Sequence, residues 1–326
     1  MSRAVDLAEG RIMAVTDLHG NWSAYQRYRD HFLMLLNRQE ADSLLFLGDI
    51  IHSYGLPEED SSLQMLLDIM WLQSELGPGR IIMLLGNHEL PHIYGITLTK
   101  GQHNFTPSFE HALGEHRRIV LDFLKGLPFL VRTSARVMFT HAGASVRTAT
   151  QAAAERLINF SHDNLLSEGD ALLERDDTMD LLSTMLHWSP EQYDQALWDF
   201  LAVAERNDPR YGDLLRGFVI SSLEPEWSLL WDFFFTQCER ENTSFPYQKI
   251  LSRFLHAFSD PEGQQEVLVT GHIPVRGGRE VICDQQLRFA SWAHAQPQST
   301  GCYLLIDLSQ RVHTAYDLLD SLHPMP

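Results

Sequence analysis

Apolar residues in the first part of the chain form short continuous runs, separated by longer stretches of mixed polarity. The runs at 12–16, 43–47 and 80–85 do not alternate with polar residues, which is typical of strands covered on both faces. The stretches at 23–37 and 61–75 carry apolar residues at helical spacing. This order predicts an α/β (α+β) protein in which helices flank a buried sheet.

The later chain continues with one more helix and then mainly with strands. We expect a single helix at 110–124, which ends near Gly126 and Pro128. Two short strands at 129–133 and 136–140 should follow it. A helix is expected at 246–258, and further strands at 266–270, 280–283, 287–291, 302–307 and 312–317.

The segment 149–239 differs from its surroundings because it has almost no strand signal. Its leucines recur at helical spacing among acidic and aromatic residues (Leu165, Leu172, Leu173, Leu181, Leu182 and Leu186). We interpret it as a helical insertion, either a cap or a packing element. No repeat or long linker divides the chain, so we expect one domain over residues 1–326 that contains this insertion.

Composition limits the classes of partner. The formal net charge is −18, and basic residues do not cluster beyond Arg117-Arg118, so we expect no nucleic-acid partner. No apolar run approaches the roughly 18 residues of a membrane span, and no secretory leader pattern is visible, so we expect a cytoplasmic protein without a membrane partner. The three scattered cysteines indicate neither a disulfide framework nor a thiolate metal site.

Five short polar segments carry the chemistry, and each begins where an apolar run ends. They are Asp17-Leu18-His19-Gly20, Gly48-Asp49, Gly86-Asn87-His88-Glu89, His141-Ala142-Gly143 and Gly271-His272. Residues two apart at a strand end point the same way, so the side chains of Asp17 and His19 should converge. Each segment alone could be an ordinary turn or helix cap, but five in this order favour a metal centre.

The residue types fit two metal ions. An ionised carboxylate has two oxygens, so Asp49 can bridge two cations. We expect the first ion to be held by Asp17, His19 and Asp49, and the second by Asp49, Asn87, His141 and His272. Water or hydroxide would complete both sites. Neutral imidazoles suit manganese, iron and zinc better than magnesium or calcium. Two such ions can activate a water and stabilise the charge that develops in an in-line displacement.

These motifs resemble those of the calcineurin-like metallophosphoesterases. Within that superfamily the chain is most similar to the serine/threonine phosphatase branch, which also contains bacterial symmetrical diadenosine tetraphosphatases. The resemblance covers roughly Arg11 to Asp317 and includes the five segments and Leu229-Leu230-Trp231-Asp232. It implies a two-sheet β-sandwich flanked by helices, with a dimetal site at the strand ends. Manganese is the expected metal, and iron, zinc or nickel are the alternatives.

The resemblance also implies ligand number and catalytic roles. Phosphodiesterase members carry Gly-His-x-His, but here Pro274 takes the place of the second histidine, so the first metal would have three protein ligands. His88 would be the general acid that protonates the leaving oxygen, with a metal-bridged water as nucleophile. The alternative for His88 is a residue that only holds Asn87 in place. We expect His294 near the rim of the cleft.

The chain departs from the branch where substrate is bound. The branch has the motif Gly-Asp-x-x-Asp-Arg-Gly, but in this chain His52 and Ser53 stand at the positions of the second aspartate and the arginine. In addition, Leu85 replaces the arginine that precedes Gly-Asn-His-Glu in the branch. Arg276 is the first candidate to bind phosphate, because arginine offers bidentate contacts. Arg147, His52 and Arg240 are further candidates, and an ordinary surface ion pair is the alternative for each arginine.

The sequence therefore predicts dimetal-dependent hydrolysis of phosphoric esters by a serine/threonine phosphatase-like phosphomonoesterase. The substrate would be a phosphorylated small molecule, a nucleotide or a phosphoprotein. The alternatives are a diadenosine tetraphosphatase-like nucleotide pyrophosphohydrolase and a non-catalytic binding module that retains the fold.

Overall fold

The computed structural model describes residues 2–55, 59–101, 103–175, 187–242, 244–260 and 263–326. The chain divides into two compact units. The first comprises Met1–Asn87, Leu127–Phe160 and Leu229–Pro326, and the second comprises His88–Gly126 and Ser161–Ser228. The second unit thus contains the middle of the expected insertion together with a segment that precedes it. Leu181, Leu182 and Leu186 lie outside the described residues.

The first unit contains both large sheets. The five-stranded sheet has the order β15 (Leu322–Pro324), β14 (Cys302–Asp307), β2 (Arg11–Val15), β3 (Ser43–Phe46) and β4 (Ile81–Met83). The six-stranded sheet has the order β1 (Ala4–Leu7), β7 (Leu130–Thr133), β8 (Val137–Thr140), β9 (Val267–Thr270), β12 (Gln286–Phe289) and β11 (Arg279–Cys283). Strands β2, β3 and β4 run parallel to one another, and so do β8, β9 and β12.

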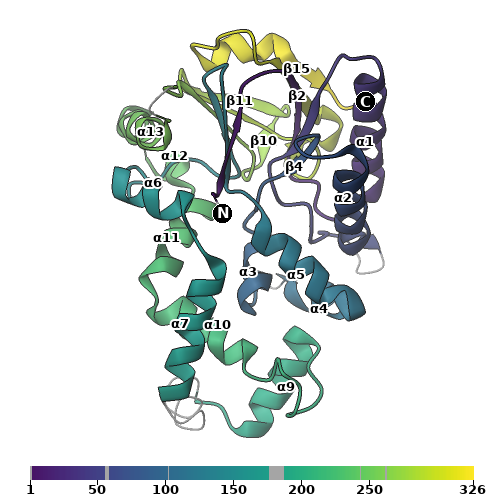
Figure 1. Ribbon diagram of the computed structural model, residues 1–326, viewed down its shortest axis with the longest axis vertical. Coiled ribbons are helices and arrows are strands. Elements are labelled where there is room, and N and C mark those ends of the chain that lie inside the picture. Colours follow the sequence, from purple (N-terminus) through teal and green to yellow (C-terminus); the bar gives the residue numbers. More distant parts are fainter. Residues whose placement is uncertain (1, 56–58, 102, 176–186, 243, 261–262) are drawn as a thin grey trace. The chain divides into compact units, whose positions relative to one another are not determined.

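The two sheets pack face to face around one apolar core. Ala14 and Leu45 from the five-stranded sheet share a buried cluster with Phe139 and Val269 from the six-stranded sheet. Helices cover the outer faces of this sandwich (Figure 1). Helices α1 (Trp22–Asn37) and α2 (Ser62–Leu76) lie along one side, and α6 (Gln151–Ile158), α12 (Cys238–Glu241) and α13 (Ser244–Phe258) along the other. The expected helix-flanked two-sheet sandwich is confirmed.

Two of the predicted elements are wrong. The single helix expected at 110–124 is instead α4 (Thr106–Leu113), a 3-10 turn at Gly114–His116 and α5 (Arg117–Gly126). Gly114 ends α4 with a φ of +45°, a conformation that glycine adopts without strain. The strand expected at 312–317 gives way to a 3-10 helix, Ala315–Ser321, which begins with a reciprocal capping box between Thr314 and Asp317.

The second unit is largely helical. Its helices include α3 (Leu90–Tyr94), α4, α5, α7 (His162–Arg175), α9 (Pro190–Leu201) and α10 (Asp213–Leu223), and α11 (Pro225–Phe234) begins at its end. Strands β5 (Thr99–Lys100) and β6 (His103–Asn104) form a short hairpin. Over the described residues, no helix has both the length and the hydrophobicity needed to cross a lipid bilayer.

Candidate metal centre

The expected metal ligands all follow strands of the sandwich. Asp17 and His19 follow β2, Asp49 follows β3 and Asn87 follows β4, whereas His141 follows β8 and His272 follows β9. The strands within each of these two sets are parallel neighbours, so their carboxyl ends lie at one edge of each sheet. The two edges bring the side chains of the candidate ligands within a few ångströms of one another.

The backbone at these strand ends is held in an uncommon conformation. Of the nine described non-glycine residues with positive φ, five lie here: Asp17, His19, Asp49, His52 and His272, with φ values from +45° to +72°. Each such residue costs about 1–3 kcal/mol and persists only where its surroundings enforce it. This concentration of strained residues is typical of a functional site.

Two glycines allow the loops to approach one another. Gly48 has a φ of +94°, and a Cβ there would lie 2.7 Å from the Cα of Gly86 and 3.0 Å from Nδ1 of His141. A Cβ at Gly271 would overlap the side chains of Thr16 and Asp17. A side chain at either position would therefore push apart loops that carry candidate ligands.

Asp49 lies between two histidines. Its Oδ2 is 3.6 Å from Nε2 of His19, and its Oδ1 is 3.5 Å from Nε2 of His141. The carboxylate is almost fully buried. With one oxygen toward each imidazole, Asp49 is placed as a carboxylate that bridges two cations would be.

One group of donors gathers around Asn87. His141 Nδ1 lies 2.8 Å from the carbonyl oxygen of Leu47, which can only accept, so this nitrogen carries the proton. His141 Nε2 then presents a lone pair, and it lies 2.7 Å from Asn87 Oδ1. His272 Nδ1 is 2.9 Å from the same oxygen. His272 Nε2 is buried and has no hydrogen-bond partner among the described residues. A cation would be coordinated by the lone pairs of the two Nε2 atoms and of Asn87 Oδ1.

A second group gathers around Asp17. His19 Nδ1 lies 3.1 Å and 3.2 Å from the carbonyl oxygens of Ile51 and His52. Because these oxygens can only accept, Nδ1 carries the proton and Nε2 presents the lone pair. Asp17 accepts the backbone N–H of His272 at 3.1 Å. His294 Nδ1 lies 3.0 Å from Asp17 Oδ1. His294 is therefore inside the cluster and buried, whereas the sequence placed it at the rim.

The environment sets the protonation states that metal ligands need. Burial lowers the pKa of His19 to about 3 and also lowers the pKa of His141 and of His272. Burial alone raises the pKa of Asp17, but the imidazoles around it, His294 foremost, outweigh burial and leave the pKa below its ordinary value. At neutral pH His19, His141 and His272 are neutral and Asp17 is ionised, which are the forms that coordinate metals.

The proposed general acid, His88, lies where the chain passes from the first unit into the second. His88 is the first residue of the second unit and directly follows Asn87, the last residue of this segment of the first unit. It is buried, and its ring packs edge-to-face on Phe105 with centroids 4.9 Å apart. The role of His88 stays a prediction.

The residues expected to contact substrate are dispersed. His52 is buried, its backbone N–H donates to Ser62 Oγ at 2.8 Å, and its backbone carbonyl oxygen helps to orient His19. Arg147 is 70% exposed and lies 3.3 Å from Asp232 in an ion pair. Arg276 is exposed in β10 (Val275–Arg276), which pairs with β13 (Ala295–Gln296) directly after His294. Arg240 donates to the carbonyl oxygen of Pro274 at 3.0 Å.

Sequence reasoning missed Tyr54. Its ring meets that of His19 edge-on, with centroids 4.9 Å apart. Burial raises the pKa of its phenol, and the negative charges of Asp49 and Asp17 add to this. A partly exposed phenol thus lies close to both carboxylates. The sequence could have indicated Tyr54, because it stands where the phosphatase branch has the last glycine of Gly-Asp-x-x-Asp-Arg-Gly.

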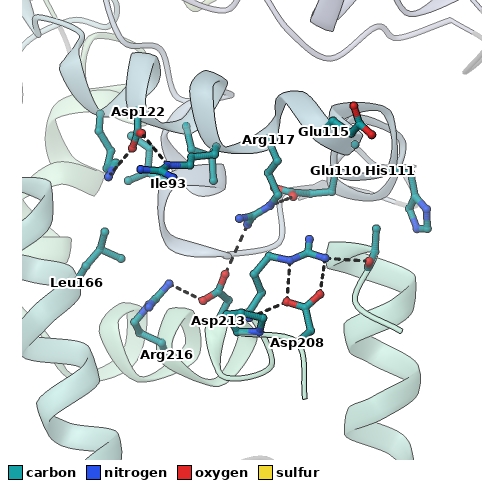
Figure 2. A pocket seen from close by; sticks show the side chains of 17 residues that line it. Ile93, Glu110, His111, Glu115, Arg117, Asp122, Leu166, Asp208, Asp213 and Arg216 are labelled. Carbon is teal, nitrogen blue, oxygen red and sulfur yellow. Dashed lines mark hydrogen bonds and ion pairs between the residues drawn. The ribbon is translucent and has the colours of Figure 1, made fainter. Parts of the chain in front are cut away.

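A second concentration of charge lines a cavity of about 750 Å³ within the second unit (Figure 2). Its cations face carboxylates at short range: Arg117 contacts Glu110 and Asp213, Arg216 contacts Asp213, and Arg210 contacts Asp208. Glu110 also accepts from His92 Nδ1 at 2.7 Å. In this cavity the cations pair with carboxylates, whereas among the described residues the sets of imidazoles and carboxylates that could hold a metal ion lie at the strand ends of the first unit. The strand ends are therefore the better candidate for the active site.

Comparisons with known proteins identify the family of the chain. The family model described as calcineurin-like phosphoesterase matches residues 10–217. A protein serine/threonine phosphatase from Saccharomyces cerevisiae with similarity to human phosphatase PP5 aligns over 94% of this chain and 77% of its own, at 14% identity and a TM-score of 0.49. A cold-active protein-tyrosine phosphatase of a Shewanella species aligns over 94% and 78%, at 15% identity and a TM-score of 0.45. A metallophosphoesterase from Sphaerobacter thermophilus aligns over 95% and 91%, at 14% identity and a TM-score of 0.36. No curated protein sequence matches the chain.

Proposed function

Because the chain belongs to the calcineurin-like phosphoesterase family, we propose that it is a phosphatase of the serine/threonine phosphatase-like type that cleaves phosphomonoesters. Family membership makes it a metal-dependent phosphoesterase. The finer assignment to phosphomonoesters rests on the missing second histidine after His272, where Pro274 stands.

The observation that carries the proposal is the convergence of donors at the strand ends. Asp17 and His19 would hold one ion, the donors around Asn87 would hold the other, and Asp49 would bridge them. The residues fit such ions because Nε2 of His272 is buried without a partner among the described residues, and because the backbone carbonyls fix the lone pairs of His19 and His141 toward Asp49. Manganese is the proposed metal, and iron, zinc or nickel are the alternatives.

The chain's own residues would orient and protonate the substrate. When bound, two divalent ions supply an activated water and stabilise developing negative charge. The carbonyl oxygens of Leu47 and Ile51 hold His141 and His19 in one tautomer, so these rings need not reorganise during the reaction. His88 would donate a proton to the leaving oxygen, because the pKa of an imidazole lies near neutrality. Arg276 would bind the phosphoryl oxygens.

Three substrates tested side by side distinguish the candidate functions. The purified protein with Mn²⁺ is assayed on p-nitrophenyl phosphate, a phosphoserine peptide and diadenosine tetraphosphate, with an EDTA-treated sample as the control. Release of phosphate from the first two supports the proposal. Cleavage of diadenosine tetraphosphate alone supports the nucleotide pyrophosphohydrolase. A protein that binds two metal ions and cleaves none of the three is a binding module. The cytoplasmic location stays a prediction.

A further inference from the structure

His294 lies on the same sheet edge as the expected ligands, although it belongs to none of the five sequence motifs. It follows β12, which is the parallel neighbour of β9 in the six-stranded sheet. The carboxyl ends of β8, β9 and β12 therefore deliver His141, His272 and the loop of His294 to one edge. The same topology that positions the expected ligands also positions this histidine.

The side chain of His294 faces the group around Asp17. Ligand atoms of Asp17, His19 and His294 all lie within 4.8 Å of one another, and all three residues are buried. The rings of His19 and His294 have centroids 5.1 Å apart. Three donors from two sheets thus converge on a common volume of a size that suits one cation.

His294 and Asp17 form a close buried contact whose geometry is poor for a hydrogen bond. Nδ1 of His294 lies 3.0 Å from Asp17 Oδ1 and the ring is only 7% exposed, yet this nitrogen has no hydrogen-bond partner among the described residues. A buried polar atom without a partner costs free energy comparable to a lost hydrogen bond. A bound cation would remove this cost, because the nitrogen and the carboxylate oxygen could both coordinate it.

The loop that carries His294 is fixed on several sides. Ser291 Oγ accepts the N–H of Thr16 at 3.0 Å and donates to the carbonyl oxygen of Cys302 at 2.8 Å. The N–H of Ala293 donates to the carbonyl oxygen of Asp17 at 3.0 Å, and the carbonyl oxygen of His294 accepts the N–H of Val275 at 2.7 Å. These bonds anchor the loop both to Asp17 and to the segment that follows His272. Such support is what a preorganised ligand requires.

We propose that His294 is a fourth protein ligand of the first metal ion, beside Asp17, His19 and Asp49. The proposal rests on the dimetal centre of the proposed function. It replaces the three-ligand site expected from Pro274: a histidine from a different strand end takes the role that the sequence motif lacks. A site with two imidazoles and two carboxylates favours manganese, iron or zinc over magnesium.

The rival role for His294 is to orient Asp17 without touching the metal. Two variants separate the roles, because His294→Ala removes both functions whereas His294→Asn keeps an amide donor near the position of Nδ1. His313→Ala is the matched control, because His313 Nδ1 also lies 2.9 Å from a carboxylate oxygen, that of Glu266, but is 63% exposed. Circular dichroism verifies that each variant is folded.

The readout is metal binding and not activity. Equilibrium dialysis against Mn²⁺ with elemental analysis should give two ions for the wild type and for His313→Ala. In both His294 variants one ion should bind at least about 100-fold more weakly, while the other keeps its affinity. Wild-type affinity at both sites in His294→Asn overturns the proposal but leaves the proposed function standing. A wild-type protein that binds no manganese overturns both.

Pulsed EPR of the wild-type manganese protein tests the same point without a variant, in case the variants do not fold. The proposal predicts four coordinated imidazoles, from His19, His294, His141 and His272. A count of three overturns it.

Discussion

The two units each contain a dense cluster of charged and titratable side chains, but the clusters differ in which side chains face one another. In the second unit, Arg117 and His92 both contact Glu110, and the neighbouring arginines contact Asp208 and Asp213. At the strand ends of the first unit, buried nitrogen atoms of His272 and His294 lack hydrogen-bond partners among the described residues. Arginines that pair with carboxylates stabilise the fold, whereas histidines and aspartates whose ligand atoms lie within 4.8 Å of one another are suited to hold a metal ion.

The clusters also differ in the backbone beneath them. The metal-centre loops hold five of the described non-glycine residues at positive φ, including Asp17, Asp49 and His272. Glu110 and Arg117 instead lie in the regular helices α4 and α5. Strain of this kind is retained where function requires it, so substitutions in the two clusters should affect different properties. Ligand substitutions should abolish activity with little loss of stability, and substitutions around Glu110 should do the reverse.

The largest effect on activity is expected from Asp49→Asn. The change removes a negative charge that both ions would share, so kcat/KM for p-nitrophenyl phosphate should fall at least about 1,000-fold, the upper end for loss of one preorganised electrostatic group. Steady-state kinetics with saturating Mn²⁺ measures this. Wild-type turnover in a folded Asp49→Asn protein would remove Asp49 from the centre.

Glu110→Gln should act on stability instead. Glu110 is buried, and replacing it leaves Arg117 without its carboxylate, so unfolding free energy should fall by about 3–5 kcal/mol. Urea denaturation measures the change. The exposed Glu115 lines the same cavity, so Glu115→Gln is the control and should change stability by less than about 0.5 kcal/mol. Equal effects in the two variants would contradict the structural role of Glu110.

The same cluster predicts a pH dependence of stability. Burial raises the pKa of Glu110, but His92 and Arg117 outweigh burial and leave the pKa lowered. A lowered folded-state pKa means that the stabilisation is complete above the unfolded pKa of about 4.3 and is lost as pH falls through the folded value. The wild type should therefore lose stability more steeply below pH ~4 than Glu110→Gln, as acid titration followed by circular dichroism would show. Parallel curves for the two proteins would contradict this.

His88→Asn tests the general acid. Loss of the proton donor should lower kcat about 100-fold on a phosphopeptide, whose alkoxide leaving group needs protonation. The loss should be smaller on p-nitrophenyl phosphate, whose leaving group does not. Bound metal should remain at the wild-type level. An equal loss on both substrates together with a loss of metal would assign His88 to holding Asn87.

The smallest effect is expected from Arg276→Ala. Removing a charge-assisted contact to phosphate should raise KM about tenfold with kcat nearly unchanged. Arg11→Ala is the matched control, because its exposed ion pair with Asp307 contributes little to stability. An unchanged KM for Arg276→Ala would exclude this arginine from the substrate site.

The position of the candidate ligands at strand ends could be predicted from the sequence, because strand ends are set by local pattern and by the parallel order of the strands. Asp17, Asp49 and Asn87 each follow an apolar run that forms a strand, and the parallel sheet brings them to one edge. His294 also follows such a run, but its partner Asp17 is distant in sequence, and no short motif joins the two. Because Pro274 stands where a second histidine would bind the first metal ion, the sequence indicated three ligands. The proposed fourth ligand, His294, approaches Asp17 only in the tertiary structure.

The wrong elements have local causes. The prediction of one helix at 110–124 did not take account of Gly114, which ends α4. The prediction of a strand at 312–317 did not take account of the Thr314-x-x-Asp317 pattern, which is typical of the start of a helix. Strand β1 was missed because its four residues, Ala4–Leu7, include an aspartate and pair only with the distant β7. Such pairing depends on contacts that a local pattern does not contain.

Anomalous diffraction from a crystal soaked in Mn²⁺ tests the contrast between the two clusters most directly. We predict two anomalous peaks at the strand ends, one beside Asp17, His19 and His294 and one beside Asn87, His141 and His272, with Asp49 between them. We predict none in the cavity lined by Arg117 and Arg216. Strand ends without manganese, or a peak in that cavity alone, would contradict the account.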